Sequence, residues 1–416
     1  MLKRLKNRTT SELRRLGTRI ENFLPVSPKL EIYTMGRCWL SDHHVFTSQC
    51  FKHQLKNLGV SFYDYALTGH WHFFYSQDPA RRLRVLDRQN TNVPYNYEHY
   101  DKLASKFADQ YGKWSQKNVD FYWCSFKSYM THVFSKCERP IVLQLSFRFE
   151  GNKKSTPEHV KKLIEVLLEL RAKGQLFILA SNRYDQMYFE YFTGVTIPKV
   201  PLCACHLKKR YHPQRDEILI APARHYPQGH HKISQIKKFF AKSQPEIELR
   251  TIRELYPQQH DPGDLSRHRA IIVLPYTIYT GAIVEYLAMG IPMFMPTSDL
   301  LSQWHIDDYL LVERKSDLSP TRCSMITGER HDSMPDPNND YDLESVNYWL
   351  KFCEWYEWPI ETFSSLEELE QKLRVADLES ISKNMLNFDR QQYDDTLLKW
   401  QHILQEIHDS PYGGIS

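Results

Sequence analysis

The feature that most constrains the fold of this chain is a repeated alternation of short apolar runs with longer amphipathic stretches that end at glycine. "RPIVLQLSFRF" at 139–149 has the pattern of a buried strand, and "EHVKKLIEVLLELRAKG" at 158–174 has that of an amphipathic helix ended by Gly174. The alternation starts near residue 30, breaks after 195 and resumes at 217. Strands that alternate with helices form parallel sheets, so the pattern predicts an α/β protein with two doubly wound, Rossmann-like halves.

The length of 416 residues favours two domains, because one hydrophobic core seldom grows so large. Pro198, Pro201 and Pro213 interrupt any regular element between the two series, which marks a linker. The predicted organisation is a basic N-terminal helix at 1–25, an α/β domain at 26–197, the linker at 198–216, a second α/β domain at 217–388, and a C-terminal helix with tail at 389–416.

Composition narrows the class of protein. With 41% hydrophobic and 25% charged residues the chain resembles a soluble globular protein, and a net charge of +4 is too small to indicate nucleic-acid binding. The 8 cysteines are scattered, which favours reduced thiols and a cytoplasmic location. Cys203 and Cys205 have no second cysteine pair at a suitable spacing, so no metal site is predicted.

The N-terminal segment "MLKRLKNRTTSELRRLGTRIENFLP" carries a capping-box pattern at Thr9 and Glu12, followed by a short apolar stripe among basic residues. A basic amphipathic helix of this kind can lie on an anionic membrane surface, peripherally and without crossing it. The alternative, a solvated helix docked on its own domain, is equally compatible with a stripe this short.

The stretch "LPYTIYTGAIVEYLAMGIPMFMP" at 274–296 reads as the end of a strand, a helix from about Thr280 and Gly281 to Gly290, and a further strand. In open α/β sheets ligands bind beyond the carboxyl ends of the strands, where helix N-termini offer free N–H groups. We therefore expect Thr280 and Gly281 to receive a diphosphate, with Tyr276 in the same candidate site. Glu285, one turn further, could accept hydrogen bonds from a ribose diol, although an ordinary exposed helical carboxylate would look the same.

The preceding strand "EILIAPA" leads into "RHYPQGHHK", which places Arg224 just past its end and Lys232 at the start of the next helix. Both cations are expected at the same rim as Thr280. Arginine can form bidentate hydrogen bonds with phosphate oxygens, and lysine supplies a localised positive charge. Together they would suit a diphosphate.

At these residues the sequence resembles a known superfamily. "GAIVEYLAMGIPMFMP" is similar to the E-x-x-x-x-G-x-P segment of GT-B glycosyltransferases, and "APARHYPQGHHK" to their donor-diphosphate loop. Fainter similarity to uncharacterised eukaryotic glycosyltransferase-like proteins covers more of the chain. The resemblance implies a GT-B-like fold of two Rossmann-like domains facing a cleft, with a last helix that crosses back to the first domain.

The resemblance also implies a function: a glycosyltransferase that moves a sugar from a UDP- or GDP-linked donor to a glycan or other hydroxyl acceptor. Glu285 would bind the ribose, and Arg224, Lys232, Thr280 and Gly281 the diphosphate. Thr277 stands where the E-x7-E signature of retaining members has its first glutamate, so the stereochemistry stays open. The chain shows no convincing Asp-x-Asp motif, and "DPGD" at Asp261 is more typical of a turn, which favours a transfer without metal or cofactor.

The N-terminal domain is expected to supply the acceptor side and, in an inverting enzyme, a base. "MGRCWLSDHH" follows the first predicted strand, "LEIYT", and would place Gly36, Arg37, Asp42 and His43 at the edge of the crevice. Asp42 and His43 are the candidate catalytic pair, although Asp42 is equally suited to cap the next helix. The remaining acceptor-side candidates are His70, Tyr184 and Asp185.

Two other functions fit the same predicted fold. A sugar-nucleotide epimerase would use the same kind of donor site, and only its product would distinguish it. A non-catalytic interaction protein, attached peripherally to a membrane, would keep the fold and lack the chemistry.

Overall fold

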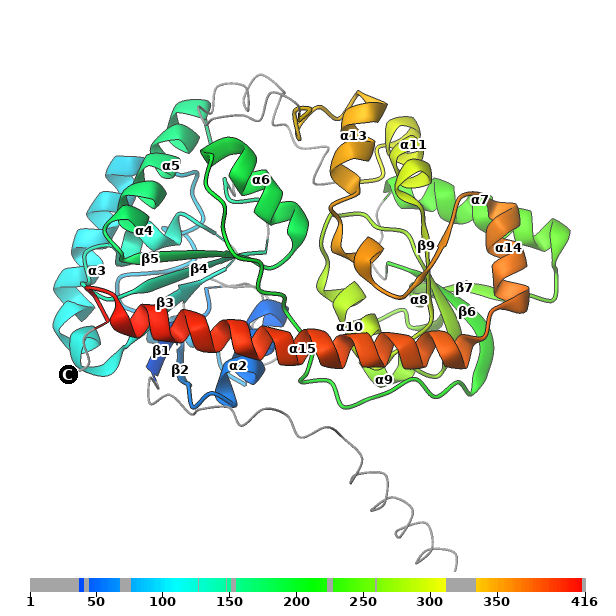
Figure 1. Cartoon of the computed structure of the whole chain (residues 1–416), viewed down its shortest axis with the longest axis horizontal. Coiled ribbons are helices and arrows are strands. Elements are labelled where there is room, and N and C mark those ends of the chain that lie inside the picture. The colour runs from blue at the N-terminus through cyan, green and yellow to red at the C-terminus, as the bar shows by residue number, and fades with distance from the viewer. Residues whose placement is uncertain are drawn as a thin grey trace, which may run out of the picture. The chain divides into compact units, whose positions relative to one another are not determined.

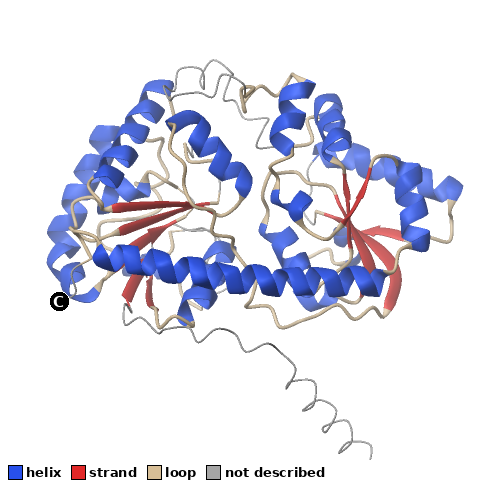
Figure 2. Ribbon diagram, in the orientation of Figure 1, coloured by secondary structure: helices blue, strands red, loops and turns tan. Residues whose placement is uncertain are grey.

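The structure is a computed structural model that describes residues 37–40, 45–67, 76–125, 127–146, 148–150, 155–222, 227–258, 260–311 and 334–413. Its strands form two separate parallel sheets with helices packed around each (Figure 2).

The first sheet has five strands in the order β2-β1-β3-β4-β5, and all its strand pairs are parallel. The strands are β1 (Arg37–Leu40), β2 (Ser61–Asp64), β3 (Phe121–Cys124), β4 (Ile141–Leu145) and β5 (Leu176–Ala180). The helices in this half are α2 (Val45–Lys56), the short η3 (Pro79–Arg82), α3 (Tyr97–Asn118), α4 (Met130–Phe134), α5 (Pro157–Ala172) and α6 (Arg183–Thr193) (Figure 1).

Neighbouring aromatic residues on β3 show how helices cover both faces of the first sheet. Tyr122 stacks on Phe134 of α4 with ring centroids 4.4 Å apart. Trp123 stacks on Phe51 of α2 at 4.0 Å, and Phe51 in turn contacts Trp400. Because successive residues of a strand point to opposite faces, α4 and α2 must lie on opposite sides of the sheet. Both strand residues are fully buried, so this strand is part of a two-sided core.

The second sheet has five strands in the order β10-β9-β8-β6-β7, again all parallel. The strands are β6 (Arg215–Ala221), β7 (Leu249–Thr251), β8 (His268–Val273), β9 (Met293–Pro296) and β10 (Glu361–Phe363). The helices in this half are α7 (Pro227–Ser243), α8 (Ile252–Leu255), α9 (Pro262–Leu265), α10 (Gly281–Met289), α11 (Ser298–Asp308), α13 (Leu343–Leu350), η4 (Glu354–Glu357) and α14 (Leu366–Val375).

The two sheets share one topology. In each, the second strand in chain order lies at an edge, and the first strand lies between the second and the third. The winding direction therefore reverses between β1 and β3, and again between β6 and β8. These reversals are the topological switch points of doubly wound sheets. The predicted α/β class with two doubly wound, Rossmann-like sheets is confirmed.

The last helix, α15 (Leu378–Asp409), contacts α10 of the second half and α2 of the first. Gly290, which ends α10 with φ of +70°, leaves room for this packing, because a Cβ there would lie 2.7 Å from Cγ of Leu386. Further along α15, Asn57 donates a hydrogen bond to the hydroxyl of Tyr393 (2.6 Å). The helix begins at Leu378, well before residue 389, where the sequence predicted the C-terminal helix to start.

Several expectations from the sequence need correction. β1 starts at Arg37, so Arg37 begins a strand instead of following one, and it lies at the amino end of the sheet. There its guanidinium pairs with Asp120 (3.2 Å). Asp261, predicted in a turn, caps α9 in a capping box with Asp264. The proposed amphipathic helix at 1–25 lies outside the described residues. Within the described part, no helix has the length and apolarity required to cross a bilayer.

Candidate functional site

The N-terminus of α10 lies at the switch point of the second sheet. β8 ends at Val273, and a loop leads to Thr280, whose extended backbone begins the helix without a side-chain capping bond. The neighbouring strand β6 ends at Ala221. Because the first amides of a helix have no partner inside it, this helix end presents N–H donors and the positive end of the helix dipole. Anionic ligands bind well at such a place.

The first residue of α10 also packs against the other half of the molecule. A Cβ at Gly281 would lie 2.6 Å from both Cγ and Cδ1 of Phe46 on α2, which is closer than real Cβ contacts come. The sequence suggested that this glycine lets a phosphate approach the backbone. The structure adds a second requirement for glycine at this position, because any side chain would meet the ring of Phe46.

Glu285, one turn along α10, faces the same helix α2. It contributes to the raised pKa of the Cys50 thiol, whose causes in order are burial and then the charges of Cys205, Cys203 and Glu285. Burial raises the pKa of the Glu285 carboxyl itself to about 7. Within the described residues this carboxyl has no hydrogen bond and no ion pair. A half-buried carboxyl in this state can donate or accept a hydrogen bond near neutral pH.

Tyr279 is a site residue that the sequence reading did not single out. Its hydroxyl oxygen is inaccessible to solvent and has no hydrogen-bond partner in the described part of the chain. Burial raises the pKa of this hydroxyl, and the charges of Glu354, Cys50, Cys203 and Asp185 add to the effect. An unpaired buried hydroxyl costs about 1–3 kcal/mol, so such groups are found where a ligand or water completes them. The sequence feature that could have indicated this role was its position directly before Thr280, the predicted start of the helix.

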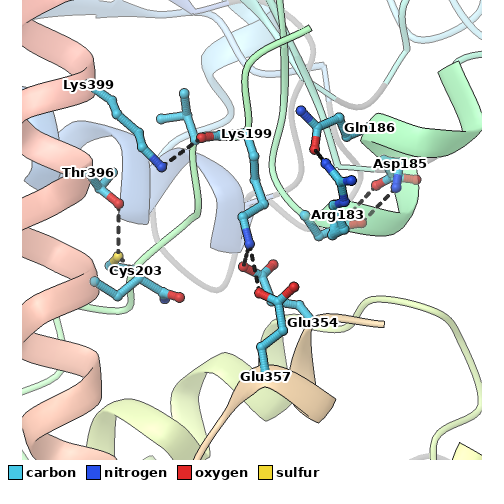
Figure 3. Close-up of polar contacts among 12 residues, drawn as sticks. Arg183, Asp185, Gln186, Lys199, Cys203, Glu354, Glu357, Thr396 and Lys399 are labelled. Atoms are coloured by element: carbon cyan, nitrogen blue, oxygen red, sulfur yellow. Dashed lines mark hydrogen bonds and ion pairs between the residues drawn. The ribbon is translucent and has the colours of Figure 1, made fainter. Parts of the chain in front are cut away.

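Two further carboxyl groups lie close to Tyr279. Glu354 of η4 pairs with Lys199 (3.3 Å), and burial still raises the pKa of Glu354 to about 7 against the opposing charge of Lys199. Lys199 also reaches Glu357 at 2.9 Å, as Figure 3 shows. This lysine comes from the segment between the sheets and the glutamates from the second half, so the ion pairs connect the two.

Asp185, predicted on the acceptor side, lies in the first turn of α6. Its backbone N–H and its carboxylate both bond to Asn182, the residue that caps the helix (2.8 and 2.6 Å; Figure 3). Burial raises its pKa to about 6. Tyr184 differs from the expectation: it is fully buried between Tyr188 and Trp349, so its side chain does not face a solute.

Lys232 also differs from the expectation. It lies in α7 near the predicted rim, but its ammonium is buried, pairs with Asp308 (2.8 Å) and lies over the ring of Trp304. His231 contacts the same carboxylate at 3.1 Å. The charge of Lys232 is therefore already balanced inside the protein, and it is not a free cation for a diphosphate. The sequence did not indicate Asp308 as the partner of Lys232, because the two residues are far apart along the chain.

The other predicted site residues divide into two groups. Tyr276 is half-buried in the loop that joins β8 to α10, and its place in the donor site stays a prediction. The remainder lie outside the described residues, and these are Gly36, Asp42, His43, His70 and Arg224.

The described ranges contain no group of three or more His, Cys, Asp or Glu side chains placed to hold a metal ion. Cys203 and Cys205 are free thiols. Burial raises the pKa of the Cys205 thiol to about 12 and also raises the pKa of the Cys203 thiol.

Searches for a matching protein family and for a similar curated protein find none. Three solved structures illustrate what the fold search finds. The kitacinnamycin glycotransferase has 9% identity and a TM-score of 0.43, with 89% of this chain and 99% of that chain covered. The glycosyltransferase SnogD from Streptomyces nogalater has 10% identity and a TM-score of 0.41, with 89% and 100% covered.

The third is the spinosyn rhamnosyltransferase SpnG, complexed with thymidine diphosphate. It has 11% identity and a TM-score of 0.35, with 88% of this chain and 99% of that chain covered. Similarities of this size assign neither a family nor a reaction to this chain, so its function has to follow from its own residues.

Proposed function

We propose that this protein is a glycosyltransferase that moves a sugar from a nucleotide-sugar donor, UDP- or GDP-linked, to a hydroxyl group of a glycan or another acceptor, without a metal ion. The observation that carries the proposal is the set of polar groups at the N-terminus of α10. Glu285 has an unpaired carboxyl, Tyr279 an unpaired buried hydroxyl, and Thr280 a side chain that caps nothing. All three lie at a switch point, where doubly wound sheets bind nucleotides.

Each group has a chemical task in this proposal. The amides at Gly281 and the hydroxyl of Thr280 bind the donor diphosphate, and Glu285 accepts hydrogen bonds from the ribose. Transfer breaks the bond between the anomeric carbon and the diphosphate oxygen and forms one to the acceptor oxygen. The departing diphosphate gains negative charge, which the helix dipole stabilises. The acceptor proton passes to a base, for which Asp42 and His43 remain the candidates.

The ion pair of Lys232 with Asp308 changes how the diphosphate charge is balanced. Lys232 is therefore no longer a candidate for the donor site, and the candidates that remain are the N-terminus of α10, Tyr276 and Arg224. Arg37 and Tyr184 are likewise no longer candidates for acceptor binding. The acceptor-side candidates that remain are Gly36, His70 and Asp185.

Calorimetric titration of the full chain with UDP, GDP and their glucose or mannose conjugates tests the proposal. We expect one nucleotide series to bind, and Glu285→Gln to weaken it about tenfold, as expected for loss of a charge-assisted hydrogen bond. The matched control is Glu406→Gln, an exposed glutamate on α15. If no nucleotide or nucleotide sugar binds, the proposal fails.

A second candidate, a protein that has the fold but catalyses no transfer, is favoured by two contacts. Phe46 covers Gly281, and Asp308 neutralises Lys232, which together leave fewer groups for a diphosphate than the sequence suggested. Release of free sugar and nucleoside diphosphate from a bound donor, measured without acceptor, distinguishes the two. Tight donor binding with no turnover under any acceptor would favour the second candidate.

A further inference from the structure

The first half of the chain contains a cavity of about 350 Å³ that is separate from the α10 site. Four aromatic side chains form its walls: Trp39 of β1, Tyr65 just after β2, and Tyr111 and Trp114 of α3. A volume of this size holds a small molecule, and aromatic walls with a few polar groups are typical of ligand sites.

The two walls from α3 meet Trp39 at steep angles, whereas Tyr65 is tilted by only 33° to it. Trp39, almost fully buried, meets Tyr111 at 68° and Trp114 at 75°. Trp114 is 37% exposed, which is unusual for a residue of its size. Because the walls from α3 are nearly perpendicular to Trp39, they form no parallel slot for a flat base. They instead offer apolar ring faces in different directions, which suit a ring with substituents above and below its plane.

The polar lining of this cavity is cationic. Arg82 and Arg84 both line it, and neither guanidinium has a hydrogen bond or an ion pair within the described residues. Among the described residues, no acidic side chain lines the cavity. By contrast, nearby Arg88 pairs with Asp78 at 2.6 Å. Arg82 and Arg84 are both exposed to solvent, so their guanidinium groups are accessible to a ligand beside the aromatic walls. They favour an anionic ligand, because arginine binds phosphate, sulfate and carboxylate through two parallel N–H donors.

Other polar groups at the cavity are also placed to contact a ligand. The backbone N–H of Arg84 donates to the hydroxyl of Tyr111 (2.9 Å), which fixes the Arg84 backbone to α3. The indole N–H of Trp39 is buried without a partner in the described part of the chain. Gln110 adds a side-chain amide that has no partner there either, and such an amide can bind sugar hydroxyls.

We propose that this cavity binds an acidic saccharide, meaning a sugar ring that carries one phosphate, sulfate or carboxylate group. The ring would lie against Trp114 and Tyr111, and the anionic group would meet Arg82 and Arg84. The site does not depend on the donor site at α10, so this inference stands or falls separately from the proposed transferase activity.

Calorimetric titration of the full chain tests this inference with glucose 6-phosphate and glucuronate as probes. Glucose and inorganic phosphate supply the two halves of the ligand separately, and UMP tests a nucleotide as the source of the anion. We expect saturable binding of at least one acidic sugar, and at least tenfold weaker binding of glucose, phosphate and UMP, since each lacks one set of contacts.

Variants locate the site. Arg82→Gln combined with Arg84→Gln should weaken the acidic sugar at least tenfold, and Trp114→Ala should do so while Trp114→Phe restores part of the affinity. Arg81→Gln, at an exposed neighbour that does not line the cavity, is the matched control. The affinity for the acidic sugar should be the same in the Glu285→Gln variant as in the wild type. It should also be unchanged when UDP is added. Absence of saturable binding by either probe, or affinity unchanged in the double arginine variant, would overturn the inference.

Discussion

The ring of Phe46 lies directly over the position where a side chain at residue 281 would begin, with Cγ and Cδ1 at 2.6 Å from an ideal Cβ. Phe46 belongs to α2 of the first half, and Gly281 is the first residue of α10 in the second. One turn further along each helix, the charge of Glu285 adds to burial in raising the pKa of the Cys50 thiol. The proposed donor site is thus bordered by α2 as well as by the loops of the second sheet.

Gly281→Ala should lower the free energy of unfolding by about 1–3 kcal/mol, the usual cost of forcing an extra carbon into a packed site. Gly112→Ala is the control, because its Cβ would make one ordinary contact at 4.0 Å inside α3, where alanine is the better helix former. Combining Gly281→Ala with Phe46→Leu should recover part of the loss in urea unfolding. A Gly281→Ala variant as stable as the wild type would contradict the close contact.

Asp308→Asn should destabilise the protein by roughly 3 kcal/mol, because it leaves the buried ammonium of Lys232 without its carboxylate. Nucleoside diphosphate affinity should stay within about twofold, since Lys232 does not bind the donor in this arrangement. Lys232→Met should give the same pattern in thermal unfolding and calorimetry. Should Lys232→Met leave stability unchanged and abolish nucleotide binding, the original assignment of Lys232 from the sequence would be correct after all.

Local patterns predicted α10 well. Gly290 adopts φ of +70° at the predicted helix end, and Thr280 is the N-cap at the predicted start. These features depend on a few adjacent residues, so they can be read from the chain directly.

Pairings between distant residues could not be read this way. Lys232 meets Asp308 and Arg37 meets Asp120, and nothing in the spacing of either pair marks them as partners. The same limit hid the role of Gly281, because Phe46 is brought to it only by the packing of two helices from different halves.

Lys199→Met should destabilise the protein far more than Lys173→Met. Lys199 balances Glu354, which is only 3% exposed, whereas Lys173 forms an exposed i,i+4 pair with Glu169. We expect a loss of about 2–3 kcal/mol for Lys199→Met and a much smaller loss for Lys173→Met, because exposed pairs contribute little. The loss should increase with pH, because an unbalanced buried Glu354 is tolerated only when protonated. Equal losses for the two variants in urea unfolding would show that the Lys199 pair is no more than a surface contact.

Glu285→Gln should stabilise the protein in a pH-dependent way. Burial raises the pKa of this carboxyl from 4.5 to about 7 in the folded chain. Between these values the folded state holds a proton that the unfolded state has released, so wild-type stability falls as the pH rises through this window. The variant has no such proton to lose. Its advantage should therefore grow across the window and level off above it, reaching on the order of 1–2 kcal/mol after allowance for partial exposure. Urea unfolding from about pH 5 to about pH 8, with Glu406→Gln as an exposed control, measures this difference. A difference that stays flat over that range would mean that Glu285 is solvated or paired, and its place in the proposed donor site would have to be given up.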